Sequence, residues 1–198
     1  MARIPAAERR TALVQAALRV VAERGIAQAT TRAIVAEAGM SLASFHYAFE
    51  SRDELIDELI ATVVAREQQA VLPEFVEGDG LRDILESGLR RYLDHLRADP
   101  GNELAMLELT WYALRSPERH HLAREQYARY MRIAEEALLV AAEHAGVRWA
   151  APVADLARVL VAFTDGLTVT WLVNRDDDTA EAVIRAAADA LTRMAEQP

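Results

Sequence analysis

The 198-residue chain contains no cysteine and no lysine, and it has only eight glycines and six prolines. The absence of cysteine excludes disulfide bonds, cysteine zinc sites and thiol nucleophiles. The absence of lysine excludes a P-loop lysine and a Schiff-base lysine, because all 22 basic residues are arginine. The scarcity of helix breakers, with 52% hydrophobic residues, favours an all-α protein with a substantial core.

The sequence also lacks the usual pattern of a targeting or membrane-crossing segment. No apolar stretch with a small-residue cleavage site lies near residue 1, so we expect no signal peptide. The longest charge-free stretch of the apolar C-terminal region is residues 166–174, well short of the roughly 20 residues that span a bilayer. We therefore expect a cytoplasmic protein that does not interact with a membrane.

The net charge of −9 is unevenly distributed along the chain. Residues 1–52 hold seven arginines against four glutamates, whereas residues 53–198 hold fifteen arginines against twenty-seven acidic residues. The overall charge argues against a protein that coats nucleic acids generally. A small basic head on an acidic body nevertheless leaves room for a local nucleic-acid interface.

Apolar residues spaced three and four apart predict about nine helices, and no long run alternates with period two, so we expect no strands. Thr30 and Ser41 are suited to cap two short helices, and Ser51 with Glu54 has the spacing of a capping box. Asp178 and Glu181 have the same spacing, and Ser116-Pro117 is a typical helix start. The expected helices cover residues 9–24, 31–38, a short segment after Ser41, 52–72, 81–98, 103–115, 118–145, 153–174 and 179–196.

The segment GMSLASFHYAFESRDEL (39–55) follows a helix with a glycine turn and a second, very short helix. Leu42, Phe45 and Phe49 share one helical face, and we expect Met40 and both phenylalanines in the core. The other faces present small residues, a hydroxyl, an imidazole and a phenol, at Ala43, Ser44, His46 and Tyr47. This is the helix-turn-helix pattern, in which a short helix poor in acids enters a major groove about 12 Å wide.

Residues 9–59 resemble the N-terminal domain of the tetracycline-repressor (TetR/AcrR) family, and the matching run is TTRAIVAEAGMSLASFHYAFESRDEL. The resemblance implies an all-α homodimer with a helix-turn-helix DNA-binding domain at 1–50 and a ligand-binding and dimerisation domain at 51–198. It implies a repressor that binds a palindromic operator and is released by a small molecule, without a cofactor.

The resemblance also assigns roles to single residues. Arg32 stands where the family contacts base and phosphate, and Arg52 stands where a basic residue holds a phosphate. His46 replaces a usual tyrosine, and Leu42 replaces a polar or basic residue. For Arg32, Arg52, Tyr47 and His46 an ordinary solvated surface role remains the alternative. The expected DNA contacts are Thr31, Arg32, Ser41, Leu42, Ala43, Ser44, His46, Tyr47 and Arg52.

The segment FTDGLTVTWL (163–172) resembles the penultimate helix of the family, which with the last helix forms the dimer interface. Helix 153–174 is apolar on nearly all sides and helix 179–196 offers small residues, so both suit a four-helix bundle between two protomers. Aromatic, methionine and polar positions suggest a pocket for a mostly apolar or aromatic effector. The candidates are Met106, Trp111, Tyr112, Tyr127, Tyr130, Met131, Phe163, Thr164, Asp165, Thr168 and Trp171.

Asp165 is a single carboxylate within an apolar helical pattern, where an unpaired charge is costly. Its partner is open: an arginine such as Arg158, a helix end across the dimer, or a cationic ligand. We favour a structural partner.

The chain shows no pattern of catalytic or metal-ligating residues. The five histidines lack metal spacing, His120-His121 is typical of a solvated face, and neither G-x-S-x-G nor a phosphate-cradling glycine loop is present. We therefore predict a ligand-responsive dimeric repressor and no enzyme. The alternative is a helical small-molecule-binding or scaffold protein whose DNA recognition is degenerate.

Overall fold

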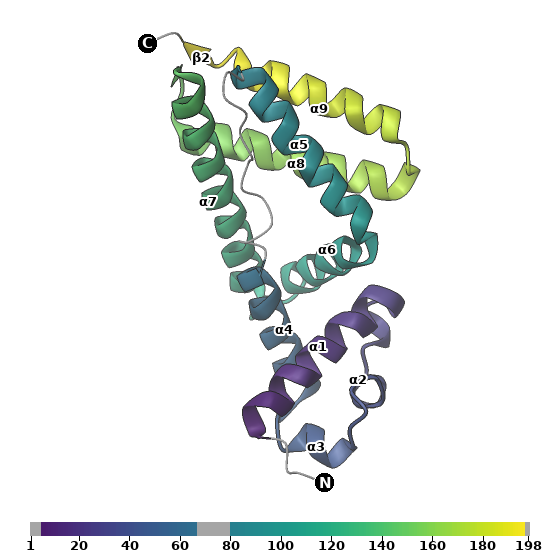
Figure 1. Cartoon of the computed structure of the whole chain (residues 1–198). Helices are drawn as coiled ribbons and strands as arrows, with labels where there is room; N and C mark the ends of the chain where they lie inside the picture. The colour runs from purple at the N-terminus through teal and green to yellow at the C-terminus, as the bar shows by residue number, and fades with distance from the viewer. Residues whose placement is uncertain (1–4, 67–79, 197–198) are drawn as a thin grey trace. The chain divides into compact units, whose positions relative to one another are not determined.

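The computed structural model describes residues 5–66 and 80–196, and it confirms the all-α class (Figure 1). In these residues every expected helix is present, although several boundaries differ, and the expected helix at 52–72 extends beyond the described residues after position 66. The elements are α1 (Ala6–Arg24), the 3₁₀ turn η1 (Ile26–Gln28), α2 (Thr31–Glu37), α3 (Leu42–His46), α4 (Arg52–Arg66), α5 (Leu81–Ala98), α6 (Pro100–Leu114), α7 (His120–Ala145), α8 (Val153–Asn174) and α9 (Asp177–Thr192).

Two short strands correct the expectation that the chain has none. Strand β1 (Arg148–Trp149) pairs antiparallel with β2 (Ala195–Glu196). A two-residue strand is too short to show alternation in the sequence, so periodicity could not reveal it. The last helix accordingly ends at Thr192, four residues earlier than expected.

Four helix starts also differ from the expectation: α1 begins at Ala6 and α6 at Pro100, each three residues early, and the starts of α7 and α9 differ as well. The cap of α9 is Asp176, whose Oδ1 accepts hydrogen bonds from the N–H groups of Asp178 (3.0 Å) and Thr179 (3.1 Å). The Thr179 hydroxyl also donates to the Asp176 carboxylate. This bond first, and then the two N–H bonds, hold the pKa of Asp176 below its usual range. Helix α7 begins at His120, because residues 117–119 form a turn after Ser116.

The chain forms two compact units, each continuous in space but not in sequence. The first comprises residues 1–66 and 101–125, and the second comprises residues 67–100 and 126–198. In the first unit α1 packs against α2 and α4, and apolar side chains of α6 join the same core. These units describe packing within one chain, and the functional boundary at residue 50 stays a prediction.

In the second unit α9 lies beside both α5 and α8 (Figure 1). Leu93, Leu96 and Ile184 are fully buried in one apolar cluster, and Leu138, Ala157 and Leu191 are fully buried in another. These clusters supply most of the stability of the unit, because burial of apolar surface is the main driving force of folding.

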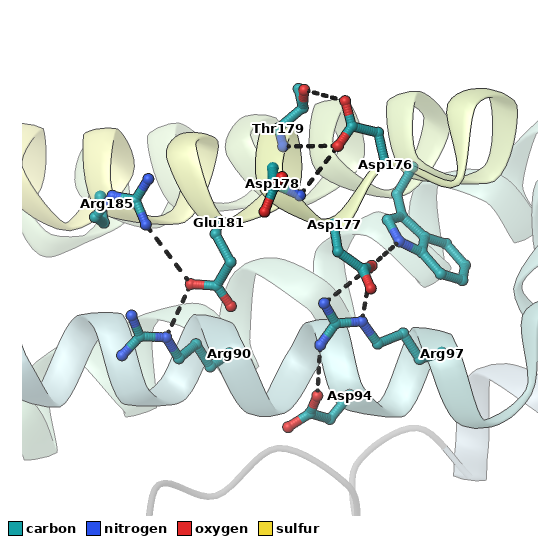
Figure 2. Close-up of polar contacts among 10 residues, drawn as sticks. Arg90, Asp94, Arg97, Asp176, Asp177, Asp178, Thr179, Glu181 and Arg185 are labelled. Atoms are coloured by element: carbon teal, nitrogen blue, oxygen red, sulfur yellow. Dashed lines mark hydrogen bonds and ion pairs between the residues drawn. The ribbon is translucent and has the colours of Figure 1, made fainter.

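A row of ion pairs joins α5 to α9 along the edge of this unit. Arg82 pairs with Asp189 (2.6 Å) and Arg90 with Glu181 (3.0 Å). Figure 2 shows the far end of the row, where the Arg97 guanidinium lies against Asp177 (2.9 Å). The indole N–H of Trp171 donates to the same carboxylate (2.8 Å). The Trp171 and Arg97 bonds hold the pKa of Asp177 below its usual range.

Helix α8 has a buried face within the second unit and an exposed stripe on the other side. Ala162, Gly166, Val169 and Val173 follow one another at spacings of four, three and four residues, and all are exposed. By length and composition α8 also meets the criterion for a membrane-crossing helix, with one third of its most apolar window buried in the fold, 33%. The expectation from the sequence rested on the nine-residue charge-free stretch 166–174, whereas this criterion tolerates the charged residues of α8, and a core helix of a folded protein also meets it.

Candidate nucleic-acid interface

The two helices of the turn are each capped as the sequence predicts. Thr30 accepts a hydrogen bond from the N–H of Ala33 at the start of α2 (3.2 Å), and Ser41 accepts one from the N–H of Ser44 at the start of α3 (3.2 Å). At the start of α4 the Ser51 hydroxyl accepts a hydrogen bond from the Glu54 N–H (3.0 Å), whereas the Glu54 carboxylate accepts one from the Glu50 N–H (2.7 Å), one residue before the donor that the capping box predicts. These bonds satisfy backbone donors that a helix end leaves unpaired.

The turn between α2 and α3 depends on Gly39, whose φ of 64° lies in the left-handed region. It places Phe45 and Phe49 in the core with Ile34 and Val35, as predicted. Because these four side chains are buried, the orientation of α3 is fixed by packing. The opposite side of α3 is therefore held out toward solvent in a defined geometry.

The exposed side of α3 carries most of the expected DNA contacts. Tyr47 is 80% exposed and Leu42 is 44% exposed, so Leu42 does not share the buried face of Phe45 as its spacing suggested. His46 is exposed with its ring at the edge of Phe45, and the Ser41 and Ser44 hydroxyls are 3.0 Å apart. On α2, Arg32 is exposed and Thr31 half-buried, whereas Ser41 and Ala43 are exposed beside Leu42.

Arg52 is the expected contact that already has partners inside the protein. Its Nε donates to the carbonyl of Ala29 (2.7 Å) and its Nη2 donates to the carbonyl of Ile26 (2.7 Å). The first residue of α4 is thereby joined to η1 and to the approach to α2. Arg52 therefore has a clear structural role, and its predicted contact with phosphate is not tested by this geometry.

A second arginine, which the sequence analysis missed, joins α1 to the start of α4. Arg10 donates to Glu54 (2.8 Å), to Glu58 (2.5 Å) and to the carbonyl of Ala48, and its guanidinium lies 4.1 Å from the centre of the Phe49 ring. The carboxylates of Glu58 and Glu54 raise the pKa of Arg10, and Arg10 and the Glu50 N–H lower the pKa of Glu54. This side chain fixes the end of the turn that follows α3.

Helix α6 contacts the turn between α1 and α2, which leads into the helix-turn-helix. The Glu108 carboxylate accepts a hydrogen bond from the N–H of Ile26 (2.5 Å), directly after Gly25, whose φ is 80°. After α6, Arg119 donates to Asp57 of α4 (2.6 Å) and pairs with Asp53 (3.0 Å). None of these contacts leaves a signal in the sequence, because the partners are 62 to 82 residues apart and lie on no common helix.

The expected effector residues fall into both compact units. Met106 is buried in the core of the first unit, Trp111 is 61% exposed, and the Tyr112 hydroxyl donates to Asp53 (3.2 Å). The remaining candidates belong to the second unit: Tyr127, Tyr130, Met131, Phe163, Thr164, Asp165, Thr168 and Trp171. Of these, Thr168 and Trp171 are buried, and Thr168 is hydrogen-bonded to the Tyr92 hydroxyl.

Four residues of α7 and α8 form one polar and aromatic group, which we call the Tyr127–Asp165 cluster: Gln126, Tyr127, Tyr130 and Asp165. The Tyr127 hydroxyl donates to Asp165 Oδ2 (3.0 Å), and the Gln126 amide donates to the Tyr130 hydroxyl (2.7 Å). The two tyrosine rings meet edge to face at 5.5 Å. Burial raises the pKa of Asp165 above its usual range, and burial with the neighbouring Asp165 raises that of Tyr127 to about 12.

A capped turn, a buried aromatic anchor and an outward-facing short helix define a helix-turn-helix DNA-binding protein. Comparison of the sequence with protein families agrees. Residues 13–59 match the profile of bacterial regulatory proteins of the tetR family, and residues 81–196 match that of the C-terminal domain of BetI-type transcriptional repressors. The chain belongs to the TetR family of transcriptional regulators, whose members are DNA-binding regulators and not enzymes.

Individual relatives support the same assignment. The HTH-type nicotine-responsive transcriptional repressor HdnoR of Paenarthrobacter nicotinovorans is 31% identical over 178 residues, which cover 88% of this chain and 89% of the relative. A TetR transcription regulator from Haloarcula marismortui matches in structure with a TM-score of 0.76 at 20% identity, covering 96% of this chain and 100% of that one. The multidrug binding protein EbrR, solved with imidazole, matches with a TM-score of 0.64 at 27% identity over 96% and 92% of the two chains.

Proposed function

We propose that the chain is a dimeric, ligand-responsive repressor that binds an inverted-repeat operator through α2 and α3. The observation that carries the proposal is the exposed side of α3, where an 80% exposed tyrosine lies next to small residues on a helix fixed by two buried phenylalanines. This exposed mixture of hydroxyls, aromatic rings and small residues is not needed to hold α3 in place, because the buried Phe45 and Phe49 do so. A groove of DNA would cover it.

The exposed stripe of α8 supports the dimer. Ala162, Val169 and Val173 point away from the core of the second unit, and α9 has a comparable exposed pair at Ala182 and Ala186. Small side chains allow two helices to approach closely, and symmetric dimers bury such self-complementary surfaces. We propose that these faces of α8 and α9 form the interface between two protomers.

The relatives support a response to a small molecule. HdnoR is named for its response to nicotine and EbrR for binding several drugs, so we propose that this chain also releases its operator when an effector binds. The effector acts only through a difference in its affinity for two conformations, typically worth about 1–3 kcal/mol. The family is typically cytoplasmic, and we propose the same location here.

Selection of bound sequences from random double-stranded DNA tests the operator. We expect an inverted repeat with half-sites about one helical turn apart, and an affinity that falls steeply with salt concentration. Arg32→Ala should cost about 1–3 kcal/mol and relax the preferred sequence, because Arg32 is exposed on α2 and suited to read a guanine edge. Arg115→Ala, an exposed arginine after α6, is the control and should change neither.

The result that contradicts this proposal is a selection that returns no inverted repeat. A protein that binds small molecules but selects no DNA sequence would support the alternative of a binding or scaffold protein.

A further inference from the structure

Asp165 is the one charged residue of α8 that has no charged partner within residues 5–66 and 80–196. The other two, Asp155 and Arg158, pair with each other in the first turns of the helix (2.5 Å). Arg158 is thus not the partner of Asp165 that the sequence suggested. The hydrogen-bond donor that does reach Asp165 is the neutral phenol of Tyr127.

The surroundings of Asp165 do not compensate its negative charge. The residue is half-buried, and its hydrogen-bond donor Tyr127 packs, like Tyr130 and Met131, against an apolar cluster of the second unit. A carboxylate withdrawn from water without a cation costs folding free energy. The raised pKa of Asp165 reports this cost, because burial outweighs the Tyr127 hydrogen bond.

Contacts within the Tyr127–Asp165 cluster fix the orientation of its side chains, but the cluster is not fully buried. Gln126 is 1% exposed and holds the Tyr130 hydroxyl, and the Tyr130 ring meets the Tyr127 ring edge to face. In contrast, Tyr127, Tyr130, Met131 and Asp165 all remain partly exposed in the described fold. Two oriented phenol rings and a carboxylate are therefore accessible from outside the core.

We propose that the Tyr127–Asp165 cluster binds an organic cation, a protonated or quaternary amine on an apolar body. The carboxylate neutralises the charge, and the tyrosine rings attract it through their negative faces while covering the apolar part. This inference rests on the proposed effector response, and it narrows the mostly apolar effector expected from the sequence to a positively charged one. It also gives a role to a costly carboxylate in an apolar helix.

A pair of probes of equal shape tests the charge requirement. Benzyltrimethylammonium and its neutral carbon isostere neopentylbenzene are titrated into the full-length protein without DNA, with calorimetry and tryptophan fluorescence as readouts. We expect saturable binding of the cation at one site per chain, at least tenfold tighter than the neutral isostere. Equal affinities, or no binding of the cation at millimolar concentration, would overturn the proposal.

Variants locate the site. Asp165→Asn should abolish the preference for the cation, whereas Asp155→Asn on the same helix should leave it unchanged. Tyr130→Leu should weaken the cation several-fold and keep its preference over the isostere. Unchanged cation binding by Asp165→Asn would show that the charge recognised lies elsewhere and would overturn the assignment.

The stability of the Asp165→Asn variant gives a second readout. A carboxyl whose pKa is raised by folding favours the folded state below its unfolded pKa and loses this contribution as pH rises through the folded value. At neutral pH without ligand, the variant should therefore melt at or above the temperature of the wild type. A clearly lower melting temperature with unchanged cation binding identifies Asp165 as structural. Because DNA is absent throughout, a failed operator selection does not affect this test, and failure here leaves operator binding intact.

Discussion

Arg52 shows how one side chain can be assigned to DNA by its position and to the fold by its contacts. Its guanidinium reaches two carbonyls, those of Ile26 and Ala29, and such a bridge requires several N–H donors in a fixed plane. A lysine has the same charge but a single, flexible ammonium group. The two roles can therefore be separated by a substitution that keeps the charge.

We predict that Arg52→Lys lowers the free energy of unfolding by about 1–2 kcal/mol, because at least one carbonyl of the η1 region loses its donor. The salt dependence of operator binding should change little, since the positive charge is kept. Urea unfolding measures the stability, and salt titrations of operator binding measure the salt dependence. Arg32→Lys, which also keeps the positive charge, is the control. An equally stable variant with weaker operator binding would show that Arg52 serves phosphate alone.

At the scale of elements, α5 and α9 are joined by apolar burial and by the row of ion pairs at their edge. Glu86 is the most buried member, 7% exposed, and it pairs with both Arg82 and Arg90 at 2.5 Å. Both arginines are about half exposed and also reach acids of α9. Loss of Glu86 therefore leaves no isolated buried charge, which limits the cost.

We predict that Glu86→Gln destabilises the protein by about 1–2 kcal/mol, more at low than at high salt concentration. Asp83→Asn, an exposed acid of the same helix, is the matched control and should have an effect below about 0.5 kcal/mol. Denaturant unfolding at two ionic strengths measures both. A salt-independent loss would indicate a packing defect in place of lost ion pairs.

The helices themselves could be predicted because they depend on local signals. Thr30, Ser41 and Gly39 act within four residues along the chain, and the four-residue spacing of Phe45 and Phe49 places both on one buried face. The long-range contacts that hold the helix-turn-helix in place could not be predicted, since Arg10 and Glu108 bind partners 38 to 82 residues away along the chain. Only the tertiary arrangement brings such pairs together, and a single sequence carries no record of it.

At the scale of the whole molecule, the exposed stripe of α8 (Ala162, Gly166, Val169 and Val173) is a surface that the fold of the single chain leaves uncovered. Val169 is 44% exposed and Val173 is 74% exposed in the single chain, although both lie on the most apolar helix. Exposed apolar residues in a continuous row usually mark an interaction surface. A second copy of the chain would cover it in the proposed dimer.

We predict that Val169→Arg weakens the dimer by at least about tenfold and lowers operator affinity with it, because like charges would meet across a two-fold axis. Leu139→Arg, at a comparably exposed apolar position on α7, should remain dimeric. Analytical ultracentrifugation at micromolar concentration measures both. A folded wild-type monomer under these conditions would contradict the dimer.

The junction of Gly25 and Glu108 restricts how this sequence can diverge. A Cβ at position 25 would lie 3.2 Å from both carboxylate oxygens of Glu108, and the φ of 80° is itself strained for any other residue. Substitution of Glu108 would remove the steric crowding at position 25 but not the backbone strain, so position 25 would still require glycine. Descendants of this chain should therefore lose the glutamate before the glycine. The order of those two events is set by the shape of a single turn.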